Sequence, residues 1–130
     1  MKFGYTIVYV KDVAKSLSFY EVAFGFKTKF LHESNDYGEL ETGETTLAFA
    51  SYELGDSNFN GQYIKGCIDN KPFGLELAFV SKNVRAAYNK ALAAGAISIK
   101  EPEQKPWGQI IAYVRTMDGE LIELCSPIEG

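Results

Sequence analysis

The stretch YTIVYVKDVAKSLSFYEVAFGF, residues 5–26, aligns without a gap with LELAFVSKNVRAAYNKALAAGA, residues 75–96, when the sequence is shifted by 70 positions. In this alignment Gly25 falls on Gly95. Identity is low, but apolar and polar residue types agree along the whole stretch. The pattern predicts that the chain contains the same structural module twice, since self-similarity at a fixed offset marks a repeat.

Each copy begins with an alternating run, 5–10 or 75–80, which has the period of two of a half-buried strand. A helix with one apolar face follows, over 13–24 or 84–94. The expected N-caps are Asp12 in the first copy and Ser81 or Asn83 in the second, and Gly25 and Gly95 are expected to end the helices. Three short strands complete each copy: 26–32, 37–42 and 45–51, then 96–100, 108–116 and 120–125.

The fold class predicted from this order is α+β, with two tandem βαβββ modules. Module one covers about 1–51 and module two about 74–130, and together they form a single domain over 1–130. The segment 52–73 between them is rich in Gly, Asn, Asp and Ser. We interpret it as a plain connector. Alternatively, because it contains aromatic residues, part of it covers a pocket.

The charge balance disfavours a nucleic-acid partner, because such proteins present clustered Lys and Arg and this chain has a net charge of -4. Residues 1–70 carry 6 basic and 10 acidic side chains, whereas 71–130 carry 7 of each. The excess negative charge is densest at Asp36, Glu39, Glu41 and Glu44. It indicates either a solvated surface or one that attracts cations.

Two cysteines, Cys67 and Cys125, are too few for a disulfide framework, and no signal peptide or long apolar run is seen. We therefore expect a cytoplasmic protein that does not associate with membranes. Cys125 lies in an apolar strand and is interpreted as a small core residue, since only His32 is present to act as its base.

The two repeated segments, together with the final hairpin DGELIEL at 118–124, resemble the vicinal oxygen chelate superfamily. This superfamily includes glyoxalase I, extradiol dioxygenases and bleomycin resistance proteins. The resemblance implies a cupped mixed sheet around a cleft, with the helices on its outer face. It places Tyr5, Ile7 and Tyr9 in the cleft with Leu75, Leu77 and Phe79, and it turns Thr6, Val8 and Val10 toward the helices with Glu76, Ala78 and Val80.

Enzymes of the superfamily hold a divalent metal with the first and last strands of each module. By the internal alignment these four positions are Tyr5, Leu75, Leu47 and Glu123. A single carboxylate and a phenol do not complete a metal shell, and a shift of one residue that would bring in Glu76 would turn that side chain to the other face. We therefore expect no metal, no cofactor and no catalytic residue.

The predicted cleft is lined by aromatic and aliphatic side chains that suit a planar ligand. We predict eight ligand-binding residues: Trp107, Tyr37, Tyr5, Tyr9, Phe49, Leu75, Phe79 and Glu123. Trp107 and Tyr37 are expected at equivalent strand starts. Glu123 has two alternative roles, as a counter-charge for a ligand amine or as a structural carboxylate paired with Arg115, Tyr5 or another donor.

The stretch PWGQIIAYVRTMDGELIEL, residues 106–124, is most similar to the bleomycin resistance subgroup, whose members are dimers that sequester a drug without converting it. The predicted function is therefore metal-free binding of a planar or cationic aromatic small molecule by a homodimer, which implies a role in antibiotic resistance. The alternative is a metal-dependent glyoxalase-like lyase or a dioxygenase-like enzyme.

Overall fold

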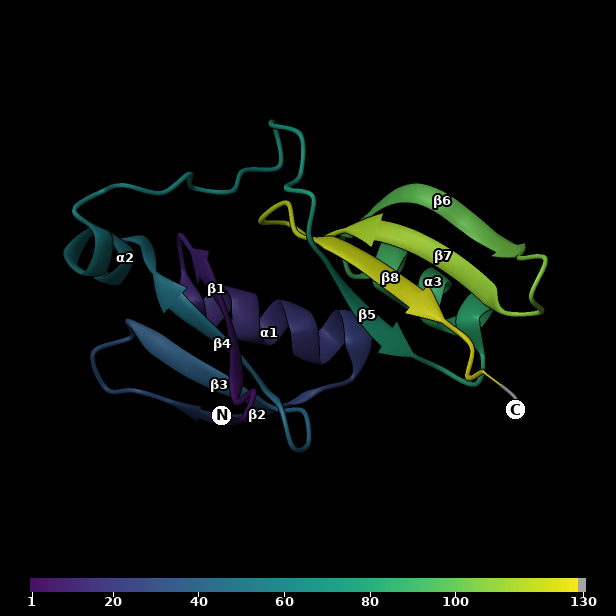
Figure 1. Ribbon diagram of the computed structural model, residues 1–130, viewed down its shortest axis with the longest axis horizontal. Coiled ribbons are helices and arrows are strands. Elements are labelled where there is room, and N and C mark those ends of the chain that lie inside the picture. Colours follow the sequence, from purple (N-terminus) through teal and green to yellow (C-terminus); the bar gives the residue numbers. More distant parts are fainter. Residues whose placement is uncertain (129–130) are drawn as a thin grey trace. The chain divides into compact units, whose positions relative to one another are not determined.

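The computed structural model describes residues 1–128 and divides into two compact units, the first over Met1–Gly66 and the second from Cys67 onward. Each unit contains a four-stranded mixed sheet covered on one face by a helix (Figure 1). The predicted α+β class with tandem βαβββ modules is confirmed. No helix among the described residues is long and apolar enough to span a membrane.

The first unit has strands β1 (Tyr5–Val10), β2 (Lys27–Leu31), β3 (Tyr37–Glu41) and β4 (Thr46–Ser51), in the sheet order β1-β4-β3-β2. Its helix α1 (Val13–Phe24) begins at Asp12, whose side chain accepts a hydrogen bond from Lys15 N, and ends at Gly25 in the left-handed conformation. A second helix, α2 (Tyr52–Phe59), follows β4 directly. The expected connector thus begins with a helix that belongs to the first unit.

The second unit repeats this arrangement with β5 (Glu76–Val80), β6 (Ile97–Gln104), β7 (Ile110–Arg115) and β8 (Leu121–Cys125), in the order β5-β8-β7-β6. Helix α3 (Val84–Ala93) begins at Asn83, whose side chain accepts from Ala86 N. Asn83, and not Ser81, is therefore the N-cap. In both units the first strand pairs in parallel with the last strand.

One face of each sheet packs on its helix. Val10, Leu40 and Phe49 are almost fully buried in the first unit, and the Phe49 ring lies 4.8 Å from that of Tyr20 on α1. Gly38 permits the close approach of α1, because a β-carbon there would lie 2.6 Å from Leu17 Cδ1. We call the opposite face of each sheet its open face, and on it Tyr5 and Ile7 are exposed.

The faces predicted for the second unit are wrong, because its first strand is shifted by one residue. Ala78 lies opposite Glu123, whereas Leu77 and Phe79 lie opposite Ile122 and Leu124, which are fully buried against the α3 side. Glu76, Ala78 and Val80 therefore occupy the open face, and Leu77 and Phe79 point toward the helix. A shift of one residue exchanges the two faces of a strand, since side chains alternate with a period of two.

The origin of the shift is the length of the helix. Tyr5 and Glu76 start their strands, and Asp12 and Asn83 cap their helices, at an offset of 71 residues. Helix α1 has 12 residues but α3 has 10, and the offset at the glycines that follow is only 70. An alignment fixed on those glycines is correct for the strands that follow them, which start at Lys27 and Ile97, and is wrong by one residue for the first strand of each unit.

Arg115, at the end of β7, fastens the start of the second unit to the β7–β8 hairpin. Its guanidinium donates to the carbonyl oxygen of Gly119 and to the carbonyl oxygens of Cys67, Ile68 and Asn70, at 2.8–3.2 Å. Arg115 is 9% exposed, so these carbonyls satisfy donors that water barely reaches. Arg115 is thus engaged with the backbone, and Glu123 instead accepts a hydrogen bond from the Tyr113 hydroxyl group.

The burial of Phe49 leads to a stability prediction. We expect Phe49→Ala to lower the free energy of unfolding by about 3–5 kcal/mol, because it leaves a cavity against Tyr20. Tyr5→Ala, on the open face, is expected to change it by about 0.5 kcal/mol or less. Urea unfolding measures both values. Equal losses for the two variants would contradict the assignment of faces.

Candidate functional site

The open face of the second sheet carries two glutamates on neighbouring strands. Glu123 lies opposite Ala78 on β5, and Glu76 is two residues before Ala78, so both side chains point to the same side. The Glu76 carboxyl group lies within hydrogen-bonding reach of Glu123. We call Glu76 and Glu123 the carboxylate pair.

Two further side chains hold Glu123 in place. Tyr113, opposite Glu123 on β7, donates a hydrogen bond from its hydroxyl group to Glu123 Oε1 at 3.0 Å. The buried Cys125 thiol also interacts with Glu123. None of the ion pairs found among residues 1–128 involves Glu76 or Glu123. The carboxylate pair therefore has hydrogen-bond donors but no ion-pair partner among the described residues.

The proximity of these groups shifts their protonation equilibria. Glu76 is exposed as a residue, yet partial burial of its carboxyl group, followed by the charge of Glu123, raises its pKa above the usual 4.5. Burial and then the hydrogen bond to Glu123 raise the pKa of Tyr113 to about 12. Burial and Glu123 also raise the pKa of the Cys125 thiol, which disfavours a nucleophilic thiolate.

The open face of the first sheet has a different character. Tyr5, Ile7 and Tyr9 project from β1, and Tyr37 and Glu39 project to the same side from β3, with β4 between the two strands. The Tyr37 hydroxyl donates to Glu39 Oε2 at 2.7 Å, and the Phe30 and Tyr37 ring centroids are 6.0 Å apart.

Glu39 is only 7% exposed, and Lys29 Nζ lies 4.0 Å from its Oε1. Burial, and then the hydrogen bond to Glu39, hold the pKa of Tyr37 well above its usual value of 10. The carboxylate of this face thus has a protein cation nearby, which the carboxylate pair lacks.

The eight predicted ligand residues therefore separate into groups. Tyr5, Tyr9 and Tyr37 lie on the first open face and Glu123 on the second, whereas Phe49 and Phe79 point to the helix side and are wrong as cleft residues. Leu75 precedes β5 and is 67% exposed.

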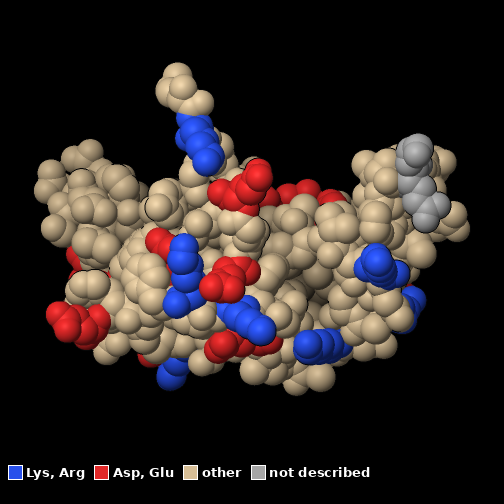
Figure 2. Space-filling model, turned by 90° about the horizontal axis from the view of Figure 1, so that it is seen from below, with Lys and Arg blue, Asp and Glu red and all other residues tan. Residues whose placement is uncertain are grey.

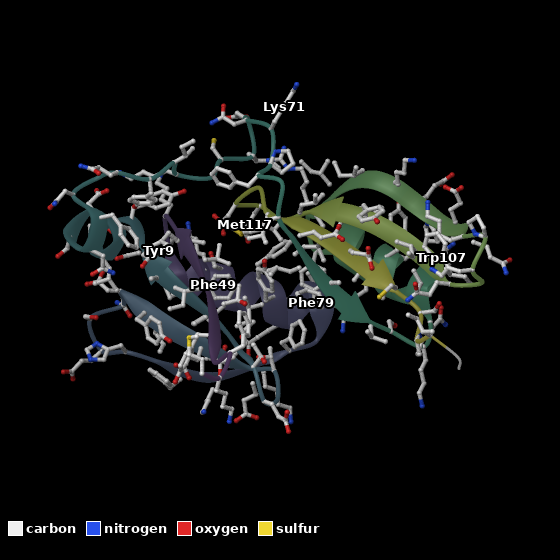
Figure 3. All side chains as sticks on the ribbon, in the orientation of Figure 1. Tyr9, Phe49, Lys71, Phe79, Trp107 and Met117 are labelled. Carbon is white, nitrogen blue, oxygen red and sulfur yellow. The ribbon has the colours of Figure 1, made fainter. Side chains whose placement is uncertain are left out.

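Trp107 lies in the β6–β7 connection at one end of the second sheet, where its indole N–H donates to Gln109 Oε1 (Figure 3). It is not equivalent to Tyr37. In the second unit, the position corresponding to Tyr37 is Ile111, because Tyr37 lies opposite Ala50 and Ile111 opposite Cys125.

Three residues of these faces, Glu39, Tyr113 and Glu76, were not predicted as site residues. The matching N-caps Asp12 and Asn83 contained the signal for Glu76, since their offset of 71 places Glu76 at the position of Tyr5. For Glu39 the local signals were its place in the acidic stretch and Tyr37 two residues before it. Nothing in the local pattern indicated Tyr113, because its partner Glu123 lies on another strand.

Relatives of known family and structure were found for the chain. The sequence profile of the Glyoxalase/Bleomycin resistance protein/Dioxygenase superfamily matches residues 2–124. The chain belongs to this superfamily. A search of curated proteins found no match.

Many solved structures share the superfamily fold. A glyoxalase-related enzyme from Fulvimarina pelagi matches with a TM-score of 0.83 and 18% identity, covering 98% of this chain and 88% of that one. A glyoxalase/bleomycin resistance protein/dioxygenase family enzyme from Burkholderia phytofirmans PsJN matches with a TM-score of 0.79 and 20% identity, covering 97% and 98%. TioX from Micromonospora sp. ML1 matches with a TM-score of 0.71 and 18% identity, covering 97% and 98%. At these identities the likeness concerns the fold.

The superfamily includes metal-dependent members, so the donor set was tested against a divalent ion. With the corrected register the four family positions hold Tyr5, Ala48, Glu76 and Glu123, because Ala48 takes the place opposite Ile7 that Glu123 takes opposite Ala78. Leu47 and Leu75 are not these positions. No group of three or more His, Cys, Asp or Glu suited to a metal occurs within residues 1–128. Neither unit alone supplies a full metal shell.

The raised pKa of Glu76 predicts a pH-dependent stability. A raised folded-state pKa means that the contribution of Glu76 to stability is present below about pH 4.5 and is lost as the pH rises through the raised value. We expect Glu76→Gln to stabilise the protein at pH 7 by about 0.2–1 kcal/mol, since it removes a like charge on a neighbouring strand.

Chemical unfolding at pH 7 and at pH 4 measures the effect, and the advantage of Glu76→Gln is expected to shrink at the lower pH. The control is Glu101→Gln, an exposed glutamate on β6. A gain of the same size at both pH values would contradict the coupling between Glu76 and Glu123.

Proposed function

We propose that the protein binds and sequesters a small cationic aromatic compound without converting it chemically. The observation that carries this proposal is the carboxylate pair, which has no ion-pair partner within the described residues. Two neighbouring carboxylates repel each other unless a proton or a cation lies between them. A protonated amine of the ligand supplies that cation at neutral pH.

The aromatic side chains of the first unit support the proposal that the ligand is aromatic. Tyr5 and Tyr37 present ring surface on the open face, and Tyr5 is 58% exposed. Such rings favour planar and cationic ligands, by stacking and by cation–π attraction. Glu39 on this face has Lys29 nearby, whereas no ion pair among residues 1–128 involves the carboxylate pair of the second unit.

A homodimer is part of the proposal. Ile7, Leu75 and Val80 are between 42% and 67% exposed, and exposed apolar residues of this kind favour association. On the face shown in Figure 2, acidic and basic side chains are interspersed, and no continuous basic patch suggests a nucleic-acid partner. Light scattering of the purified protein tests the dimer.

A metal-dependent lyase or dioxygenase is the second candidate. It is favoured by one observation: the corrected register places two carboxylates, Glu76 and Glu123, at family metal positions instead of one. Elemental analysis of the freshly purified, untagged protein separates the two candidates. A stoichiometric divalent metal would contradict sequestration without metal and support the enzyme.

The binding proposal predicts a dependence on ligand charge. We expect a planar aromatic amine to bind measurably in calorimetry, and its uncharged N-acetyl analogue to bind about tenfold or more weakly. Glu123→Gln is expected to weaken binding of the amine by a similar factor, because it removes a charge-assisted hydrogen bond.

The matched control, Glu101→Gln, changes a glutamate outside the carboxylate pair and is expected to leave affinity unchanged. Equal affinity for the amine and its acetylated analogue, or equal affinity of Glu123→Gln and the unmodified protein, would refute the role of the carboxylate pair.

A further inference from the structure

The Lys65 ammonium group lies among three side chains from α2 and the residues after it, Tyr52, Asp56 and Tyr63, which we call the box. Its Nζ lies 3.1 Å from Asp56 Oδ2, and it is 5.5 Å from the centroid of the Tyr52 ring and 5.9 Å from that of Tyr63. A carboxylate and two ring faces are the groups that proteins use to hold an ammonium ion.

The box fastens the segment that follows α2. Residues 60–66, which we call the strap, fold back so that the Tyr52 hydroxyl donates to the carbonyl oxygen of Gly66 at 2.6 Å. The Tyr63 hydroxyl in turn donates to the carbonyl oxygen of Tyr52 at 3.1 Å. Tyr52 therefore meets three elements of the strap: the Lys65 ammonium, Gly66 and Tyr63.

Together α2 and the strap cover Tyr9 on the first open face. The Tyr9 ring lies 5.6 Å from that of Phe59 and 5.5 Å from that of Tyr63, and Asn58 Nδ2 donates to the Tyr9 hydroxyl at 3.2 Å. A β-carbon at Gly55 would lie 2.9 Å from Tyr9 and 2.5 Å from the Tyr63 hydroxyl oxygen. Only glycine permits this closeness.

We propose that Lys65 is the latch of this strap, and that removal of its positive charge releases residues 60–66 from α2 and uncovers Tyr9. The Asp56 carboxylate provides the driving force. Its Oδ1 is buried and accepts no hydrogen bond from the described residues, and its Oδ2 pairs with Lys65. Without the ammonium ion the carboxylate loses that cation, and opening of the strap gives water to the buried Oδ1.

The strap carries few interactions that would hold it without Lys65. The Gln62 amide donates to Phe59 O, the two tyrosine hydroxyl bonds add to it, and the Tyr63 ring packs on those of Tyr9 and Phe59. Segments with few backbone hydrogen bonds open with a low free energy, independently of the rest of the fold. The latch therefore controls a local opening and leaves the sheet intact.

The test compares Lys65→Met with Lys65→Arg by limited chymotrypsin digestion, with cleavage after Tyr63 followed by mass spectrometry. Methionine keeps an apolar stem without the charge, so we expect cleavage about fivefold faster or more. Arginine keeps the charge and is expected to behave like the unmodified protein. Lys71→Met, which removes an exposed lysine outside the strap, is the matched control (Figure 3).

Hydrogen exchange of β4 reports on the sheet in the same samples. Faster cleavage of Lys65→Met with unchanged exchange in β4 supports the latch. Unchanged cleavage would overturn it, and so would faster cleavage accompanied by faster exchange in β4, since the variant would then destabilise the whole unit. If Lys65→Arg were cleaved as fast as Lys65→Met, the role of the positive charge would be overturned.

One consequence for ligand binding rests on the proposed function. If Tyr9 receives the aromatic part of the ligand, Lys65→Met is expected to bind the planar aromatic amine with a higher association rate than Lys71→Met, measured by stopped flow. Failure of every variant to bind the amine would refute the proposed function and leave the proteolysis result for the latch standing. If Lys65→Met is cleaved faster than Lys71→Met but binds the amine at the same rate, opening of the strap does not control ligand entry.

Discussion

The parallel ladder between β5 and β8 is the constraint on which the candidate site depends. It places Ala78 opposite Glu123 and turns Leu77 and Phe79 toward buried Ile122 and Leu124. Apolar burial on the α3 side fixes this register, because a slip by one residue would expose the apolar set and bury Glu76. The carboxylate pair lies on the open face because apolar residues of the same strands pack on the other face.

The duplicated fold presents different chemistry on its two open faces. At the position where the second unit has Glu123, the first has Ala48, and where the second has Glu76 the first has Tyr5. The first unit instead carries Glu39 on β3, with Tyr37 and Lys29 as neighbours. One backbone thus supports an aromatic face whose carboxylate lies near a lysine and an acidic face whose two glutamates form no ion pair with residues 1–128.

Much of the fold could be predicted from local patterns. The bounds of α1 and β1 agree with the predicted 13–24 and 5–10, and the superfamily followed from the repeated segments. The site was predicted less well. Phe49 and Phe79 belong to the helix-facing sides, and Trp107 lies in a connection and not at the position equivalent to Tyr37. Tyr113 gained its role from Glu123 on the neighbouring strand, and Glu39 gained its lysine neighbour from β2, which local sequence does not record.

The sequence by itself determined the order of the elements and their ends. The capping residues and the periodicity of apolar positions act within a few residues of the chain, so they can be read without knowledge of the partner elements. Only the tertiary structure decided the faces. In LELAFV, 75–80, both alternating sets contain apolar residues, and only Glu76 distinguishes them. The choice was made by the buried residues of β8, which lie about 45 positions away and accept Leu77 and Phe79 beside them.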